Sequence, residues 1–142
     1  MIKRAGIYIR VSSERQAEKV SPQVQEMECR SYCEARGYQE VGVYRDIERY
    51  RIGKKLVDPS GTRSDRPQFK RMLADCTNNT LDVIIAWKED RLYRSIRPML
   101  DLLDCIEKYK VDVELVKETF DRQMAPIKAA IARMELTSRV LC

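Results

Sequence analysis

The sequence predicts an α/β fold in which helices cover both faces of a mostly parallel central sheet, with a long helix at the carboxyl end. Two observations support this prediction. Short apolar segments alternate along the chain with longer segments whose apolar residues recur at helical spacing. Residues 83–86 are apolar without a polar break, as expected of a strand buried on both faces of a parallel sheet.

Strands and helices are expected in strict alternation. The predicted strands are residues 5–11, 38–44, 81–87 and 111–116. The predicted helices are residues 22–36, 67–78, 95–108 and 126–142. Because each connection between consecutive strands contains a helix, the strands should run parallel with right-handed crossovers.

Cap and turn residues define the first half of the chain. After a polar loop, Ser21 and Pro22 are typical of a helix N-cap and a first helical residue, and Gly37 is a typical C-terminal stop. Asp46 follows the second strand. The segment 47–66 then carries many charges, glycines and a proline, which predicts an irregular, mobile surface loop.

In the second half, Pro67 is again a good first helical residue. Apolar residues recur at helical spacing in the later helices, as Phe69, Met72, Leu73 and Cys76, as Met99, Leu103 and Ile106, and as Ile127, Ala130, Ile131 and Met134. The last helix has no glycine stop. We therefore expect this chain to be the amino-terminal part of a larger protein.

Length and composition indicate one domain of ordinary size with a positive net charge. The chain has 142 residues, a net charge of +5 and a pI near 9.0, which favour a polyanionic partner. No signal peptide is recognisable, and no stretch approaches the roughly 20 apolar residues of a membrane-spanning helix. The five cysteines are scattered and odd in number. We expect reduced thiols, a cytoplasmic location and no membrane contact.

The chain contains no histidine. This excludes Ser-His-Asp and Cys-His catalytic arrangements and argues against a zinc site. Neither of the glycine-rich phosphate loops GxGxxG and GxxxxGK[ST] is present. We therefore expect neither a metal nor a cofactor, and an activated serine would need another general base and another source of positive charge.

Two polar clusters follow predicted strands. Ser12 follows the first strand, which also carries Arg10, and a second cluster of Asp90, Arg91 and Arg94 follows the third. The carboxyl ends of parallel strands meet at one edge of the sheet, so the clusters should form one site. Arginine binds two phosphate oxygens at once, and Arg91 and Arg94 would face the same side of a helical turn. The sequence predicts a phosphoryl-transfer site, with Asp90 as a proton-transfer or arginine-positioning group.

Four spaced motifs lie between residues 8 and 94, within a match that covers nearly the whole chain. They are Tyr8-x-Arg10-Val11-Ser12, Ser21 to Gln25 at the start of a helix, Ser60-Gly61-Thr62 with Asp65-Arg66-Pro67, and Asp90-Arg91-Leu92-x-Arg94. Together they resemble the catalytic domain of serine site-specific recombinases, the family of resolvases, invertases and large phage or transposon integrases.

The resemblance implies a role for each matching residue. It implies Ser12 as the nucleophile and Asp90 as the acid beside the arginines. The implied phosphate-binding and transition-state groups are Arg10, Arg66, Arg91 and Arg94. The implied supporting polar residues are Tyr8, Gln25 and Asp46.

The resemblance also implies a reaction and an assembly. Double-stranded DNA would be cleaved and rejoined at specific recombination sites through a covalent 5′-phosphoserine bond, without metal or ATP. A homodimer would hold each site, and a tetramer would form the active synapse. Residues 1–122 would be the catalytic domain, and residues 123–142 would begin a helix for oligomerisation, with the DNA-binding region beyond it. The protein would be encoded by a bacterium or a phage.

Plainer interpretations stay open. Ser12 could cap the turn after the strand, which would leave Ser13 as the more exposed hydroxyl, and Asp90 and Arg94 could be an ordinary ion pair on one helix. A non-catalytic DNA-binding or regulatory module would bind DNA in a salt-sensitive way without Ser12. A flavodoxin-like enzyme would bind a small phosphorylated ligand, which the missing glycine-rich loop disfavours.

Overall fold

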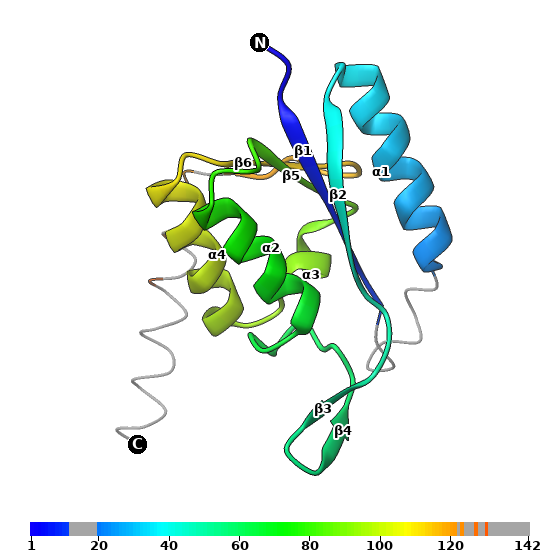
Figure 1. Ribbon diagram of the computed structural model, residues 1–142, viewed down its shortest axis with the longest axis vertical. Helices are drawn as coiled ribbons and strands as arrows, with labels where there is room; N and C mark the ends of the chain where they lie inside the picture. Colours follow the sequence, from blue (N-terminus) through cyan, green and yellow to red (C-terminus); the bar gives the residue numbers. More distant parts are fainter. Residues whose placement is uncertain (12–19, 122, 124–126, 128–129, 131–142) are drawn as a thin grey trace.

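Parallel strands form the central sheet of this computed structural model, which describes residues 1–11, 20–121, 123, 127 and 130. The sheet order is β2-β1-β5-β6, from the strands β1 (Arg4–Arg10), β2 (Gln39–Asp46), β5 (Val83–Ala86) and β6 (Asp112–Leu115). One face is covered by α1 (Pro22–Arg36), and the other by α2 (Pro67–Thr77) and α4 (Ile96–Lys108) (Figure 1). The predicted fold class is confirmed. The helix predicted over 126–142 lies almost entirely outside the described residues.

Helix α1 begins and ends at the residues that the sequence predicts. The Ser21 hydroxyl accepts a hydrogen bond from the N–H of Val24 at 3.2 Å, and Pro22 is the first helical residue. Gly37 follows the helix with a φ of 73°, a left-handed conformation that glycine adopts without strain.

Within the described residues, no helix is both long enough and apolar enough to cross a membrane.

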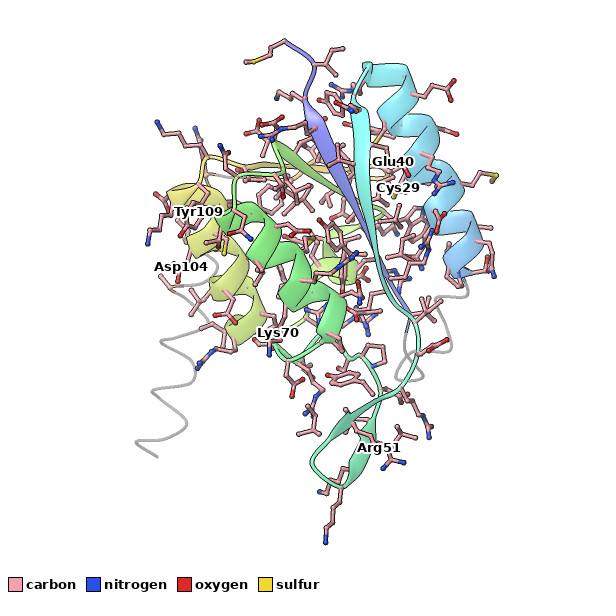
Figure 2. All side chains as sticks on the ribbon, in the orientation of Figure 1. Cys29, Glu40, Arg51, Lys70, Asp104 and Tyr109 are labelled. Atoms are coloured by element: carbon pink, nitrogen blue, oxygen red, sulfur yellow. The ribbon has the colours of Figure 1, made fainter. Side chains whose placement is uncertain are left out.

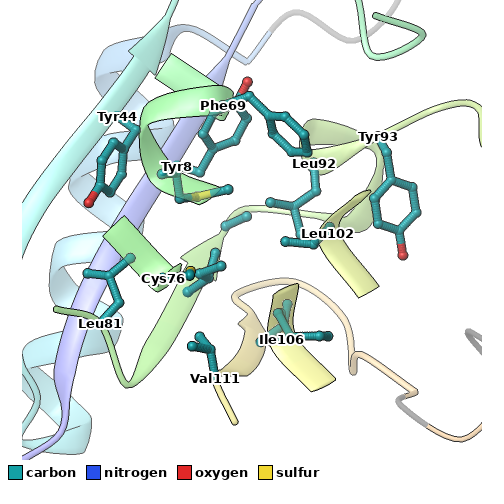
Figure 3. Packing of buried hydrophobic residues seen from close by; sticks show 14 of the residues in the cluster. Tyr8, Tyr44, Phe69, Cys76, Leu81, Leu92, Tyr93, Leu102, Ile106 and Val111 are labelled. Atoms are coloured by element: carbon teal, nitrogen blue, oxygen red, sulfur yellow. The ribbon is translucent and has the colours of Figure 1, made fainter. Parts of the chain in front are cut away.

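Side chains of β1 alternate between two cores. Ile7 packs with Cys29 of α1 on one face of the sheet. Tyr8 packs on the other face, where its ring lies edge-on to Phe69 of α2 with centroids 5.8 Å apart (Figure 3). Successive strand residues point to opposite faces, so Arg10 lies on the same face as Tyr8. Both are fully buried, and β1 therefore presents a tyrosine and an arginine to the α2 side of the sheet.

The segment 47–66 differs from its prediction as an irregular loop. It contains an antiparallel hairpin of β3 (Tyr50–Ile52) and β4 (Lys55–Val57), which projects from the end of the sheet at which β1 ends (Figure 1). Gly53 opens the two-residue turn with a φ of 61°, as in a type II′ turn. The charged residues gave these two strands no apolar alternation from which they could be predicted. The hairpin is defined by pairing between its two strands and not by burial of one apolar face.

Strand β2 extends two residues beyond its prediction. It ends at Asp46, which pairs with Arg10 of β1, so Asp46 closes a strand rather than opening a loop. The reason is the parallel pairing with β1, which continues to the last residue of both strands. This register brings the Asp46 side chain to the beginning of α2.

Candidate active site

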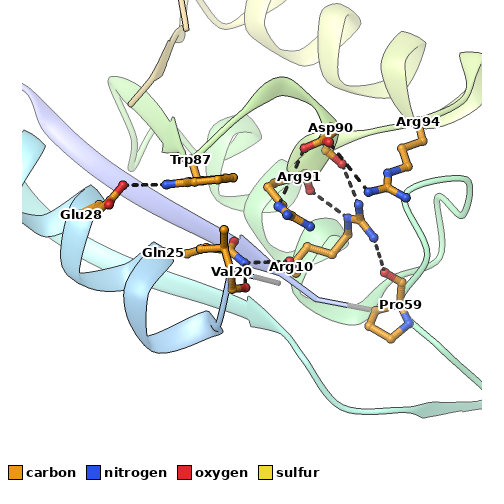
Figure 4. A network of polar contacts seen from close by, with 9 residues as sticks. All are labelled: Arg10, Val20, Gln25, Glu28, Pro59, Trp87, Asp90, Arg91 and Arg94. Atoms are coloured by element: carbon orange, nitrogen blue, oxygen red, sulfur yellow. Dashed lines mark hydrogen bonds and ion pairs between the residues drawn. The ribbon is translucent and has the colours of Figure 1, made fainter. Parts of the chain in front are cut away.

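Arg10, from the first predicted polar cluster, meets the second cluster where β1 and β5 end. A short helix, α3 (Glu89–Leu92), follows β5 and carries Asp90 and Arg91. The buried guanidinium of Arg10 donates to the main-chain carbonyls of Asp90 at 2.7 Å and Arg91 at 3.2 Å (Figure 4). It also donates to the carbonyl of Pro59 at 3.4 Å. Arg10 thus connects the end of β1 to α3 and to the connection that follows the hairpin.

Ser12, the predicted nucleophile, lies outside the described residues. The backbone on both sides of its segment is held by Gln25, a buried residue of α1. The Gln25 amide donates to the carbonyls of Arg10 at 3.3 Å and Val20 at 3.2 Å. One side chain therefore joins the two ends of the segment that contains Ser12.

Asp90 lies between two arginines (Figure 4). Its carboxylate oxygens lie 3.8 Å from Nε of Arg91 and 3.8 Å from Nη2 of Arg94. These distances are longer than hydrogen bonds, so the attraction is electrostatic. The side chains are mostly buried, with exposed fractions of 26% for Asp90, 5% for Arg91 and 11% for Arg94. With Arg10, three guanidinium groups and one carboxylate form a positively charged group suited to a phosphate.

Arg91 and Arg94 do not meet through a shared helical turn, contrary to the sequence prediction. Helix α3 ends before Tyr93, which is extended with φ −161° and ψ 157°. The N–H of Arg94 donates instead to the carbonyl of Gly61 at 2.7 Å. A Cβ at Gly61 would lie 2.8 Å from Cγ of Arg94 and 3.2 Å from Cζ of Arg10, so glycine permits this close packing. Tertiary contact with the 47–66 segment therefore places Arg94.

The other predicted residues form a buried group below this site. Nη1 of Arg66 donates to the Tyr8 hydroxyl at 2.7 Å, and that hydroxyl donates to Asp46 at 2.7 Å. Asp46 also accepts the N–H groups of Gln68 at 3.0 Å and Phe69 at 2.9 Å, so it caps α2. Burial raises the pKa of Tyr8 well above its usual value, which keeps the hydroxyl protonated.

Arg66 links this group to the site. Its guanidinium is fully buried and lies 4.0 Å from the centre of the Phe69 ring. It donates to the carbonyls of Arg63 at 2.7 Å and Leu92 at 2.6 Å. Because Leu92 follows Arg91 directly, Arg66 supports the backbone of α3 from the interior.

Trp87 makes two contacts that were not expected from the sequence, one of them to the predicted residue Arg91. The indole of Trp87 donates to Glu28 of α1 at 2.6 Å, and Cζ of Arg91 lies 5.6 Å from the centre of its ring (Figure 4). The bond from Trp87 lowers the pKa of Glu28. A signal was present, because the chain's single tryptophan directly follows a strand and precedes the Asp90 motif.

The profile of the family described as "Resolvase, N terminal domain" matches residues 5–139. The serine recombinase gin of Escherichia phage Mu is 30% identical over 82 residues, which cover 54% of this chain and 42% of that protein. The chain thus spans less than half the length of this curated relative.

Solved structures show the same likeness. The N-terminal catalytic domain of TP901-1 integrase has a TM-score of 0.72 and 30% identity, covering 98% of both chains. The C-terminal catalytic domain of ISC1926 TnpA, an IS607-like serine recombinase, has a TM-score of 0.63 and 26% identity, covering 90% of this chain and 78% of that one.

Proposed function

Because this chain belongs to the resolvase N-terminal domain family, we propose that it is the catalytic domain of a serine site-specific recombinase that cleaves and rejoins double-stranded DNA. The observation that carries the proposal is the meeting of Arg10, Arg91 and Arg94 around Asp90. Arg10 is the last residue of β1, two residues before Ser12.

In the proposed reaction, Oγ of Ser12 attacks the phosphorus of a DNA phosphodiester. A bond forms between Oγ and phosphorus while the bond to the 3′ oxygen breaks. The serine gives up its proton and the leaving oxygen takes one up, which yields a 5′-phosphoserine and a free 3′-hydroxyl. The phosphoserine retains the energy of the broken ester, so a 3′-hydroxyl can attack it and reseal the strand without ATP.

The arginines neutralise the charge that develops on the phosphate oxygens, a task that metal ions perform in other phosphoryl-transfer enzymes. The main-chain carbonyls around Arg10 fix its guanidinium before DNA binds. Asp90 positions the other two arginines from between them. Arg66 is as fully buried as Arg10, and its bond to the Leu92 carbonyl supports α3 from the interior, so we give it a positioning role beside the phosphate contact expected from the sequence.

The proposal includes the organisation of the larger protein. Residues 1–122 form the catalytic domain, and residues 123–142 begin a helix used in oligomerisation, with a DNA-binding region beyond it. Dimers hold each recombination site and a tetramer forms the synapse, in the cytoplasm of a bacterial host. The match to a domain described as the N-terminal catalytic domain of an integrase supports the place of the catalytic domain at the amino end.

A covalent adduct tests the proposed function. The chain is fused to a sequence-specific DNA-binding module and offered paired half-sites, and protease-sensitive protein–DNA adducts are resolved on a denaturing gel. The fusion should form an adduct in the presence of a chelator and without ATP. Ser12→Ala should abolish the adduct and Ser13→Ala should retain it.

Two results would contradict the proposal. An adduct that survives Ser12→Ala would assign the chemistry to another residue. A fusion that binds the half-sites but forms no adduct, also after extension with the rest of its natural chain, would favour a non-catalytic DNA-binding module.

A further inference from the structure

The β3–β4 hairpin carries most of the chain's net charge. Residues 47–57 contain four basic residues and one acidic residue, so they hold +3 of the chain's net +5. Arg51, Lys54 and Lys55 are exposed, and no acidic side chain within the described ranges forms an ion pair with them. Figure 2 shows Arg51 on the part of the hairpin that extends away from the body. These charges are available to a partner.

The base of the hairpin is held in place. The Tyr50 hydroxyl donates to Asp65 at 2.6 Å, and Arg63 pairs with the same carboxylate at 2.8 Å. On the other side of the hairpin, Arg49 pairs with Asp58 at 3.1 Å. These polar contacts on both sides of the base give the hairpin a defined direction, which lowers the entropy lost when it binds.

The hairpin is also close to the candidate active site. Strand β4 ends two residues before Pro59, whose carbonyl accepts a hydrogen bond from Arg10 at 3.4 Å. Lys54 at the turn precedes Pro59 by five residues, so it lies at most about 17 Å away along an extended strand. DNA rises about 3.4 Å per base pair, so this length corresponds to about five base pairs.

We propose that the β3–β4 hairpin is a DNA-binding arm that contacts backbone phosphates within about five base pairs of the cleaved bond. This inference rests on the proposed function, because it takes the bound DNA as the partner. The charge of the partner favours duplex DNA over a second copy of this chain. Duplex DNA carries one negative charge per about 1.7 Å of its axis, whereas a second copy of this chain carries a net +5 and would repel the hairpin.

The salt dependence of DNA binding tests the arm. The Ser12→Ala chain, which cannot proceed to cleavage, is titrated against a labelled duplex of about 30 base pairs between about 50 and 200 mM KCl. The test variant adds Arg51→Gln, Lys54→Gln and Lys55→Gln. The matched control instead adds Lys3→Gln, Lys108→Gln and Lys110→Gln, three exposed charges at the opposite end of the sheet.

The test variant should bind DNA more weakly than the parent, and its plot of log affinity against log salt should be shallower by about 0.9 for each lost phosphate contact, or about 2.7 in total. The control should keep at least most of the parent slope. Equal slopes for parent and test variant, or no binding by the parent at the lowest salt, would overturn the arm. Lost self-association with unchanged DNA affinity would also overturn it and would make the hairpin an interface between copies.

A footprint on the unsubstituted chain gives an independent result. Bound duplex should slow the acetylation of Lys54 and Lys55 but not of Lys108 and Lys110, as measured by mass spectrometry. Equal protection of all four lysines would overturn the proposal. Failure of the arm can be distinguished from failure of the proposed function. A chain that never forms an adduct could still show these salt slopes and this footprint. A chain that forms the Ser12 adduct but shows neither result would lack only the arm.

Discussion

The Tyr8 hydroxyl donates a hydrogen bond to Asp46 at 2.7 Å within the interior, where Tyr8 is fully buried and Asp46 is 3% exposed. The same oxygen accepts a bond from Arg66 at 2.7 Å. Tyr8→Phe would therefore leave two buried charged groups each without one partner. We expect the free energy of unfolding to fall by about 1–3 kcal/mol, as measured by urea denaturation.

Tyr109→Phe is the control for this change. Tyr109 is half-buried at the end of α4, and its hydroxyl has no hydrogen-bond partner among the described residues. Its loss should leave the urea midpoint almost unchanged. Equal destabilisation by the two variants would show that the buried network adds nothing specific.

Gln25→Ala tests the bridge across the segment that contains Ser12. The amide contacts the backbone at both ends of that segment, so its loss should misplace the nucleophile. We expect adduct formation to slow by up to about a hundredfold, because displacements of about 1 Å can have effects of this size. Gln23→Ala, on the exposed side of the same helix, should keep the rate. Similar rates for both variants would remove Gln25 from the site.

Gly61→Ala tests the close packing around the arginines. The added methyl group would lie 2.8 Å from Cγ of Arg94 and 3.2 Å from Cζ of Arg10, so one or both side chains must move. We expect slower adduct formation by a chain that remains folded by circular dichroism. Gly37→Asn is the control, because that position is open and asparagine tolerates its positive φ. An unchanged rate in Gly61→Ala would mean that the arginines tolerate the displacement.

Trp87→Leu tests whether the indole positions Arg91. The ring lies 5.6 Å from the guanidinium, a contact worth about 0.5–2 kcal/mol, so adduct formation should slow by about twofold to thirtyfold. Affinity for the duplex should change little. Glu28→Gln keeps an acceptor for the indole and should retain most of the rate. A slow Glu28→Gln with a normal Trp87→Leu would assign the effect to the carboxylate.

Alkaline pH should destabilise the fold through Tyr32 and Tyr38. Burial, together with hydrogen bonds to Glu114, raises the pKa of each to about 12. Because the unfolded chain releases these protons near pH 10, the stabilisation is complete below about pH 10 and is lost as the pH rises towards 12. The urea midpoint should fall over this range, and it should fall less in Tyr32→Phe/Tyr38→Phe. Parallel pH profiles for both proteins would contradict this assignment.

Local sequence patterns were sufficient to predict the strands of the central sheet and the helices that cover it. Ser21, Pro22 and Gly37 define the ends of α1 through contacts with residues only a few positions away in the sequence. The unbroken apolar run before the Asp90 motif predicted a central strand, and β5 is buried along its whole length. Motif order was likewise sufficient to identify the family, since it requires only residue types and spacing.

The hairpin and the placement of Arg94 could not be predicted in the same way. The β3 and β4 strands are short, exposed and charged, so neither has the apolar periodicity that marks a strand. Arg94 takes its position from a hydrogen bond to Gly61, thirty-three residues earlier in the chain. Helical spacing correctly predicted that Arg91 and Arg94 lie near each other. The reason was wrong, because the extended Tyr93 separates them and they do not share a helical turn.

The sequence by itself determined the α/β architecture, the edge of the sheet at which the polar clusters gather, and the residue types available for phosphate chemistry. Only the tertiary structure decided the environment of each charge. It buried Arg66 against Phe69, made Asp46 the cap of α2 and fixed Arg10 on main-chain carbonyls. The physical reason is that backbone preference and apolar periodicity act between near neighbours, whereas the partners of a buried charge come from segments that meet only when the chain folds.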